Sequence, residues 1–81
     1  MQLIYVFINA EPGKLWEIAE VATKTKGIKR ADAVTGEYDV IVYAELNDIN
    51  QLNELIHQIQ DIKGVIRTRT SIVISTQTLL L

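Results

Sequence analysis

Two short stretches, KGIKR at residues 26–30 and KGVIR at residues 63–67, are near copies of each other. Sliding the chain against itself by thirty-seven positions superimposes them without a gap, and the flanking apolar positions then coincide as well. Ile18, for example, falls on Leu55. The chain is therefore predicted to consist of two related halves, each of which reads strand, helix, strand.

Local signals set the expected element boundaries. The first helix should begin around Pro12, because proline suits an early helical position, and should stop at Gly27. The second helix has Asp48 as its N-cap, with Gln51 placed to complete a capping box, and Gly64 as its stop. The apolar runs predict four strands, at Gln2 to Asn9, Ile28 to Val34, Asp39 to Leu46 and Val65 to Ser75.

The order βαββαβ is that of the α+β, ferredoxin-like sandwich, a four-stranded antiparallel sheet with both helices on one face. The first strand, LIYVFIN at residues 3–9, has more apolar residues than one buried face needs. Both of its alternating sets are apolar, whereas a sheet with one wet face alternates apolar and polar. We expect the helix-free face to be covered by a second copy of the chain in a two-fold homodimer.

Composition excludes several functional classes. A chain of 81 residues makes one domain, 1–81, and its net charge of −2 with scattered basic residues argues against direct nucleic-acid binding. There is no cysteine and no apolar run of about 20 residues, which predicts a cytoplasmic protein without a membrane segment. The one histidine, His57, has no partner at metal-ligand spacing, and no nucleophile has an evident base. We therefore expect no metal, no cofactor and no enzyme activity.

The second half of the chain resembles a known family. TGEYDVIVYAELND (residues 35–48), the amphipathic segment from Leu52 to Ile62 and IKGVIRTRTSIV (residues 62–73) resemble the C-terminal effector-binding domain of Lrp/AsnC transcription regulators, also called the RAM domain. The resemblance extends over essentially the whole chain, although residues 1–27 match by pattern only. Typical members carry a helix-turn-helix domain before this module, whereas the present sequence starts in the predicted first strand. We therefore expect a stand-alone effector domain.

The resemblance also implies a function. Such a domain would sense an amino acid or a related small metabolite and would regulate transcription through its assembly state. It implies homodimers that join into ring-like oligomers, with the ligand held between dimers by the TGEYD hairpin and the last strand. Full-length Lrp/AsnC-type regulators would be possible partners.

Three candidate ligand-binding residues lie in the hairpin. Gly36 allows the turn, and its backbone N–H groups would be open to a ligand carboxylate. Asp39 either caps the turn or accepts a charge-assisted hydrogen bond from a ligand ammonium group. Tyr38 is either a lid over the ligand or an aromatic contact between subunits.

Four more candidates lie in the last strand, RTRTSI. Strand alternation places Thr68 and Thr70 on one face and Ser71 on the other. Threonine is a common strand residue, so a purely structural role is the alternative. Their hydroxyls could hold a carboxylate or an amide, and the resemblance adds Ile72 to the pocket.

Two other functions remain open from the sequence. An ACT-like amino-acid sensor shares βαββαβ, and Gly13 lies in the loop where that family carries a glycine. A small dimeric α+β barrel enzyme would need polar groups between sheet and helices, where the predicted helix stripes are aliphatic.

Overall fold

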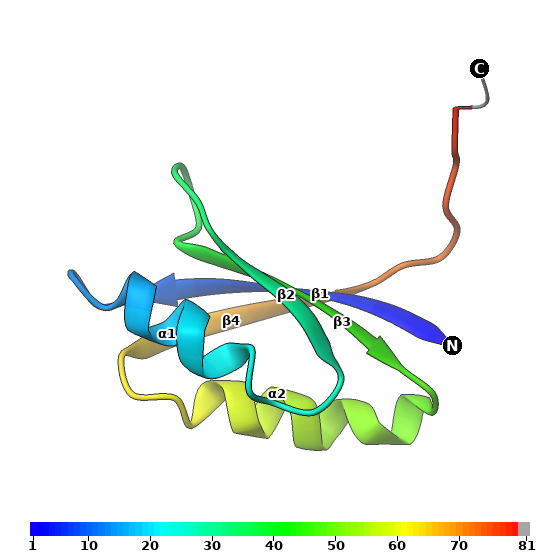
Figure 1. The fold of residues 1–81 in the computed structure, drawn as a ribbon, viewed down its shortest axis with the longest axis horizontal. Helices are drawn as coiled ribbons and strands as arrows, with labels where there is room; N and C mark the ends of the chain where they lie inside the picture. Colours follow the sequence, from blue (N-terminus) through cyan, green and yellow to red (C-terminus); the bar gives the residue numbers. More distant parts are fainter. Residues whose placement is uncertain (80–81) are drawn as a thin grey trace.

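The structure, a computed structural model, describes residues 1–79 and confirms the predicted βαββαβ order (Figure 1). Short connections join its elements, and the sheet lies above a layer of two helices in this view. The elements are β1 (Gln2–Ala10), α1 (Leu15–Ala22), β2 (Ile28–Ala33), β3 (Val40–Leu46), the short 3-10 helix η1 (Ile49–Gln51), α2 (Leu52–Gln60) and β4 (Val65–Ile72).

The strand order in the sheet is β2-β3-β1-β4, and every neighbouring pair is antiparallel. Strand β1 is central and pairs along both edges. Val6, for example, lies opposite Val42 of β3 on one side and opposite Thr70 of β4 on the other. Since directly paired residues share a face, the register assigns each strand residue either to the helix face or to the helix-free face.

The core lies between the sheet and the two helices. Alternate residues of β1 and β3 meet the inward faces of α1 and α2, and in residues 1–79 no buried side chain is polar or charged. The side chains buried between the layers of the described chain are aliphatic, as the predicted helix stripes indicated. The core residues are Ile4, Val6, Ile8, Ile18, Ala22, Ile28, Val40, Val42, Ala44, Leu46, Leu55 and Ile59.

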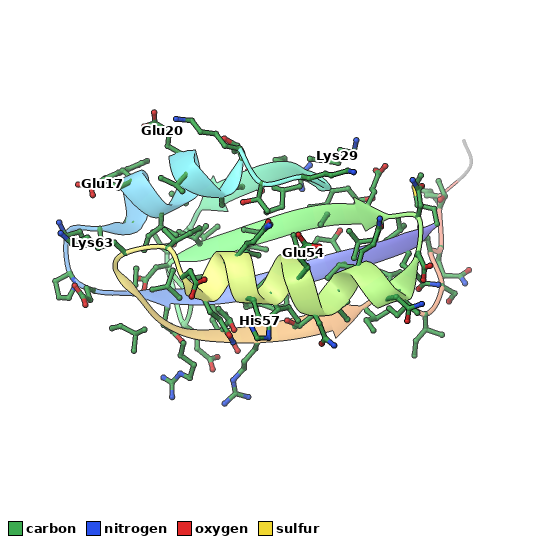
Figure 2. All side chains as sticks on the ribbon, turned by 90° about the horizontal axis from the view of Figure 1, so that it is seen from below. Glu17, Glu20, Lys29, Glu54, His57 and Lys63 are labelled. Atoms are coloured by element: carbon green, nitrogen blue, oxygen red, sulfur yellow. The ribbon has the colours of Figure 1, made fainter. Side chains whose placement is uncertain are left out.

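The polar sides of the helices face solvent. Figure 2 shows Glu17 and Glu20 of α1, and Glu54 and His57 of α2, pointing away from the sheet. His57 is exposed, as expected from its position on the polar side of the helix. None of the helices in the described residues is long and apolar enough to cross a membrane.

Helix α1 starts three residues later than predicted. Pro12 and Gly13 form a turn, in which Lys14 N donates to Glu11 O at 3.1 Å, and the helix begins only at Leu15. Gly13 has φ of 80°, outside the range of a right-handed helix, so the helix cannot include it.

The predicted capping box at the second helix is also absent. Asp48 caps η1 by accepting from Asn50 N at 2.9 Å, and α2 begins after this tighter turn, at Leu52. Gln51 makes no side-chain cap bond. The cap residue was therefore identified correctly, but the reciprocal bond was not, because the first turn is a 3-10 helix.

Strand β4 is shorter than predicted and ends at Ile72. The hydrogen bond from Val73 N to Leu3 O, 2.9 Å, is the last one toward β1, because β1 itself begins at Gln2. Beyond it, the chain continues past the end of the sheet (Figure 1). An extended sequence pattern does not form a strand where the partner has ended.

Alanine substitutions at Gly13 and Gly64 compare an open turn with a closely packed one, the turn before β4. Gly13 and Gly64 have similar φ, 80° and 99°, so alanine at either position costs about 1–2 kcal/mol of backbone strain. A Cβ on Gly64 would also meet Lys14 Cβ at 2.9 Å, whereas a Cβ on Gly13 meets nothing within 4 Å. We expect Gly64→Ala to lower the free energy of unfolding by about 1–3 kcal/mol more than Gly13→Ala, measured by urea denaturation. Equal losses would contradict this account.

Candidate functional site

The hairpin between β2 and β3 is closed by a hydrogen bond from Val34 N to Asp39 O at 2.9 Å. Gly36 at its tip has φ of 108°, and a Cβ there would meet nothing within 4 Å. The glycine is thus required by backbone conformation and not by a close neighbour. The space in front of its backbone is open, as a ligand-binding turn would need.

Asp39 anchors this hairpin to the end of β1. Its Oδ2 accepts a hydrogen bond from Ala10 N at 2.7 Å, and its own N–H donates to Ile8 O at 2.9 Å. The carboxylate therefore caps a backbone group of another strand, in place of the local turn N–H considered from the sequence. A carboxylate has about four lone-pair sites, so this bond leaves room for a further donor.

Asn9 joins the hairpin to the last strand. Its Nδ2 donates to Glu37 O of the hairpin at 2.9 Å, and its Oδ1 accepts from Arg67 Nε of β4 at 3.4 Å. One amide side chain thus contacts both elements in which the family resemblance placed the ligand site.

Tyr38 lies on the helix-free face, where its ring centroid is 5.1 Å from that of Phe7. The ring centroid of Tyr5 is 6.4 Å from that of Phe7 and 5.2 Å from that of Tyr43. We call these four residues the aromatic row. Arg30 lies over the Tyr43 ring at 5.9 Å from its centroid. All four rings are only half-buried, because they shield one another and no helix or strand in residues 1–79 covers them. The segment from Val73 to Gln77 borders Tyr5 and Tyr43.

Tyr43 also has an altered acidity. Desolvation by its neighbours raises the pKa of its phenol above the ordinary value of 10.0, and the hydrogen bond to Glu45, 3.2 Å, raises it further. Tyr43 therefore stays neutral at physiological pH and donates a hydrogen bond to that carboxylate.

The candidates in β4 divide between the two faces of the sheet. Thr68, Thr70 and Ile72 pair with the buried residues of β1 and so belong to the helix face. Thr68 accepts a hydrogen bond from Gln60 Nε2 of α2 at 3.2 Å. Ser71 pairs with Tyr5 and lies on the helix-free face, as the alternation predicted.

These candidates are also spread along the strand. Thr68 lies opposite Ile8, the residue to which the hairpin is bonded, so it is at the hairpin end of the sheet. Ile72 is four residues further on, about 13 Å away at 3.3 Å per residue. One copy of the chain thus brings Gly36, Tyr38, Asp39 and Thr68 to one end, but it does not gather all seven predicted residues into one pocket.

Sequence reasoning missed the residues that tie this end together. Asn9 was read only as the end of a strand, and Arg67 as a surface residue that would pair with Asp32 or Glu45. The alternation in LIYVFIN placed Tyr5 and Phe7 together on one face, without deciding which face is helix-free, and no local signal showed that Asn9 faces both neighbouring elements. The described residues contain no group of three acidic, histidine or cysteine side chains able to hold a metal ion.

Comparison with known proteins connects this geometry to a family. The family model of the Lrp/AsnC ligand binding domain matches residues 3–78. An uncharacterized HTH-type transcriptional regulator of Pyrococcus abyssi is 34% identical over 67 residues, which span 83% of this chain and 46% of the regulator. The homocitrate synthase of Sulfurisphaera tokodaii is 42% identical over 48 residues, 59% of this chain and 10% of the enzyme. The chain thus spans less than half the length of either relative.

Solved structures show the same fold. TTHA0845 from Thermus thermophilus superposes with a TM-score of 0.90 at 24% identity, over 98% of this chain and 100% of that one. The transcriptional regulator NMB0573 of Neisseria meningitidis, solved as an L-Met complex, superposes with a TM-score of 0.82 at 17% identity, over 96% of this chain and 53% of that one. At these identities the likeness concerns the fold.

The anchoring role of Asp39 leads to a stability test. Asp39→Ala leaves the Ala10 N–H without its acceptor and should cost about 1–3 kcal/mol, whereas Asp39→Asn keeps an acceptor oxygen and should cost less. Asp32→Ala is the matched control, because it removes a carboxylate from an exposed pair with Arg30 and should cost at most about 1 kcal/mol. Urea denaturation measures all three, and equal losses for Asp39→Ala and Asp32→Ala would contradict the anchoring role.

Proposed function

This chain belongs to the Lrp/AsnC ligand binding domain family, and we propose that it is a regulatory domain that binds an amino acid or a related small metabolite and acts through its assembly state. The observation that carries the proposal is the helix-free face, where an aromatic row lies beside the hairpin. The proposal has two parts, assembly and sensing, which rest on different residues.

Assembly is supported by the helix-free face. Besides the aromatic row, Leu3 and Ile41 share this face, since Leu3 alternates with the buried residues of β1 and Ile41 pairs with Phe7. A contiguous apolar patch of this kind on a sheet surface marks an interaction site. A second copy related by a two-fold axis presents the same patch, so we propose a homodimer with the two sheets face to face.

Sensing is assigned to the hairpin end. The open backbone at Gly36 and the Thr68 hydroxyl suit a ligand carboxylate, while Asp39 suits an ammonium group. Because Thr70, Ser71 and Ile72 lie further along β4, a site that uses all seven candidates would draw on more than one copy of the chain. The L-Met complex of the Neisseria regulator supports the choice of an amino acid as ligand.

The mechanism that follows is linkage between ligand and assembly. A ligand held between dimers binds the assembled state more tightly than the separate dimers, and so it shifts the equilibrium toward larger, ring-like oligomers. The effect of the ligand is limited to its difference in affinity for the two states. Through the same surfaces the domain would join full-length Lrp/AsnC-type regulators and influence transcription without contacting DNA itself.

The dimer part of the proposal is tested by light scattering. A single chain has a mass of 9.1 kDa, and we expect the protein to elute from a sizing column as a dimer or a larger species. Tyr5→Glu would bury an unpaired charge in the interface, which costs about 3–5 kcal/mol and should shift the protein toward monomer. Val21→Glu, a change at an exposed apolar residue of α1, is the control and should leave the mass unchanged. A wild-type monomer would contradict the face-to-face dimer.

The sensing part is tested by adding amino acids. At least one of the common amino acids should raise the melting temperature or the mass of the oligomer. Asp39→Asn should abolish that response with little loss of fold stability, because it removes the charge but keeps an acceptor for Ala10 N. Glu37→Gln, a charge removal at the exposed hairpin tip, is the control. A full response from Asp39→Asn would show that this carboxylate does not hold the ligand.

A further inference from the structure

The two halves of the chain are not packed alike at their equivalent turns. Helix α1 of the first half packs against the turn at Gly64 of the second half. A Cβ placed there would meet Lys14 Cβ at 2.9 Å, Lys14 Cγ at 3.1 Å and Ile18 Cδ1 at 3.3 Å. The start of α1 therefore fills the space beside this turn.

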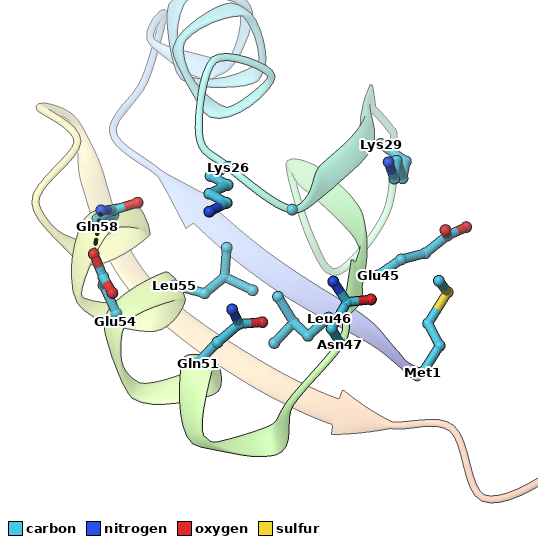
Figure 3. A pocket seen from close by; sticks show the side chains of 11 residues that line it. Met1, Lys26, Lys29, Glu45, Leu46, Asn47, Gln51, Glu54, Leu55 and Gln58 are labelled. Carbon is cyan, nitrogen blue, oxygen red and sulfur yellow. Dashed lines mark hydrogen bonds between the residues drawn. The ribbon is translucent and has the colours of Figure 1, made fainter.

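Helix α2 does not approach the equivalent turn at Gly27 in the same way. A Cβ on Gly27 would meet only Leu46 Cδ2 at 2.9 Å and Glu45 O at 3.5 Å within 4 Å, and both belong to the end of β3. The internal repeat equates Lys14 with Gln51 and Ile18 with Leu55. These two residues stand back from Gly27 and line a cleft of about 390 Å³ between η1, α2 and the turn (Figure 3).

The cleft has an apolar floor and a polar rim. Figure 3 shows Leu46 and Leu55 at its base, with Lys26 on the turn and Gln51 at the start of α2 facing each other across it. A volume of this size lies within the range of small-molecule pockets, which typically combine an apolar lining with a few placed polar groups.

The two ammonium groups of the rim are available to bind a ligand acceptor. Within residues 1–79, neither Lys26 nor Lys29 forms an ion pair. Both carboxylates of the rim have a donor already. Glu54 Oε1 accepts from Gln58 Nε2 at 3.3 Å, and Glu45 accepts from the Tyr43 hydroxyl at 3.2 Å. These donors are neutral, so the rim keeps charges of both signs. The carboxylates nevertheless each have one hydrogen-bonding partner, whereas the ammonium groups have none among the described residues and are the free donors of the cleft.

We infer that this cleft is a binding site for a small aliphatic carboxylate. The carboxylate group would bind between Lys26 Nζ and the Gln51 amide, and the aliphatic chain would lie on Leu46 and Leu55. A charge-assisted hydrogen bond from Lys26 supplies the selectivity for an anion. The cleft is at the end of β3 opposite the hairpin, and its base at Leu46 and Leu55 is on the helix side of the sheet, so it lies apart from the proposed amino-acid site.

The test is a titration of the whole chain with isocaproate, a branched aliphatic carboxylate, followed by amide chemical shifts in NMR spectra. We expect shifts at Gly27, Gln51 and Leu55, and a Kd of about 1 mM, which is typical of a weak small-ligand site. Isocaproamide, the neutral amide of the same shape, should bind at least about tenfold more weakly. No shifts at the cleft with isocaproate, or equal binding of isocaproamide, would overturn the inference.

Three variants assign the binding to this cleft. Lys26→Met keeps the aliphatic stem of the side chain and should weaken isocaproate binding by roughly tenfold to a hundredfold. Lys24→Met removes an exposed charge outside the cleft and should have no effect. Gln51→Phe should block the cleft by filling the space that Lys14 fills in the other half. Unchanged binding in Lys26→Met would overturn the proposed contact.

Titration with L-leucine distinguishes two classes of carboxylate ligand, amino acids and carboxylic acids without an ammonium group. L-Leucine carries the aliphatic chain and carboxylate of the probe together with an α-ammonium group. Tighter binding than isocaproate at the same amides assigns the cleft to amino acids, with Glu54 or Glu45 as the acceptor. Weaker binding assigns it to carboxylic acids without an ammonium group. Either result supports a carboxylate site, and a response of isocaproate at the hairpin amides alone would overturn it.

Discussion

Strand β1 must pair along both edges while one row of its side chains is buried under the helices, and the rest of the fold follows from this constraint. Ile4, Val6 and Ile8 are fully buried, and each has a partner on both neighbouring strands. A slip of one residue in either pairing would turn this row toward the helix-free face. The burial of three aliphatic residues thus determines the register of β1 with both of its neighbours.

The same alternation leaves the opposite row of β1 without a covering element. On that face, Tyr5 and Phe7 stack along the strand and against Tyr43 and Tyr38 of the neighbouring segments. The stacking shields the rings only in part. A sheet that is apolar on both faces gains most stability when a second layer covers it, and this is the physical reason for connecting the domain's stability with its assembly.

The sequence predicted the fold well because the internal repeat and the strand alternation are local or periodic signals. It placed Thr68 and Thr70 on the face opposite Ser71, as observed. It failed at the start of α1, where the positive φ of Gly13 forms a turn, and at η1, where the first turn tightens. Both errors concern single-residue geometry that the hydrophobic pattern does not report.

The candidate site was harder to predict because its contacts join distant parts of the chain. The acceptor role of Asp39 involves Ala10, 29 positions earlier, and that pair is visible only once β1 and β3 are aligned. Similarly, the space beside Gly27 could not be read from the repeat. Equivalent residues in the two halves suggest equivalent packing, yet Lys14 and Gln51 lie differently against their turns.

Asn9 connects the hairpin to the last strand. Its amide donates to Glu37 O on one side and accepts from Arg67 on the other, so the loop and the last strand are linked through one side chain. Rotation of that side chain would break or strain both bonds together. Asn9 thus couples the position of the loop to that of the edge strand on the other side of β1.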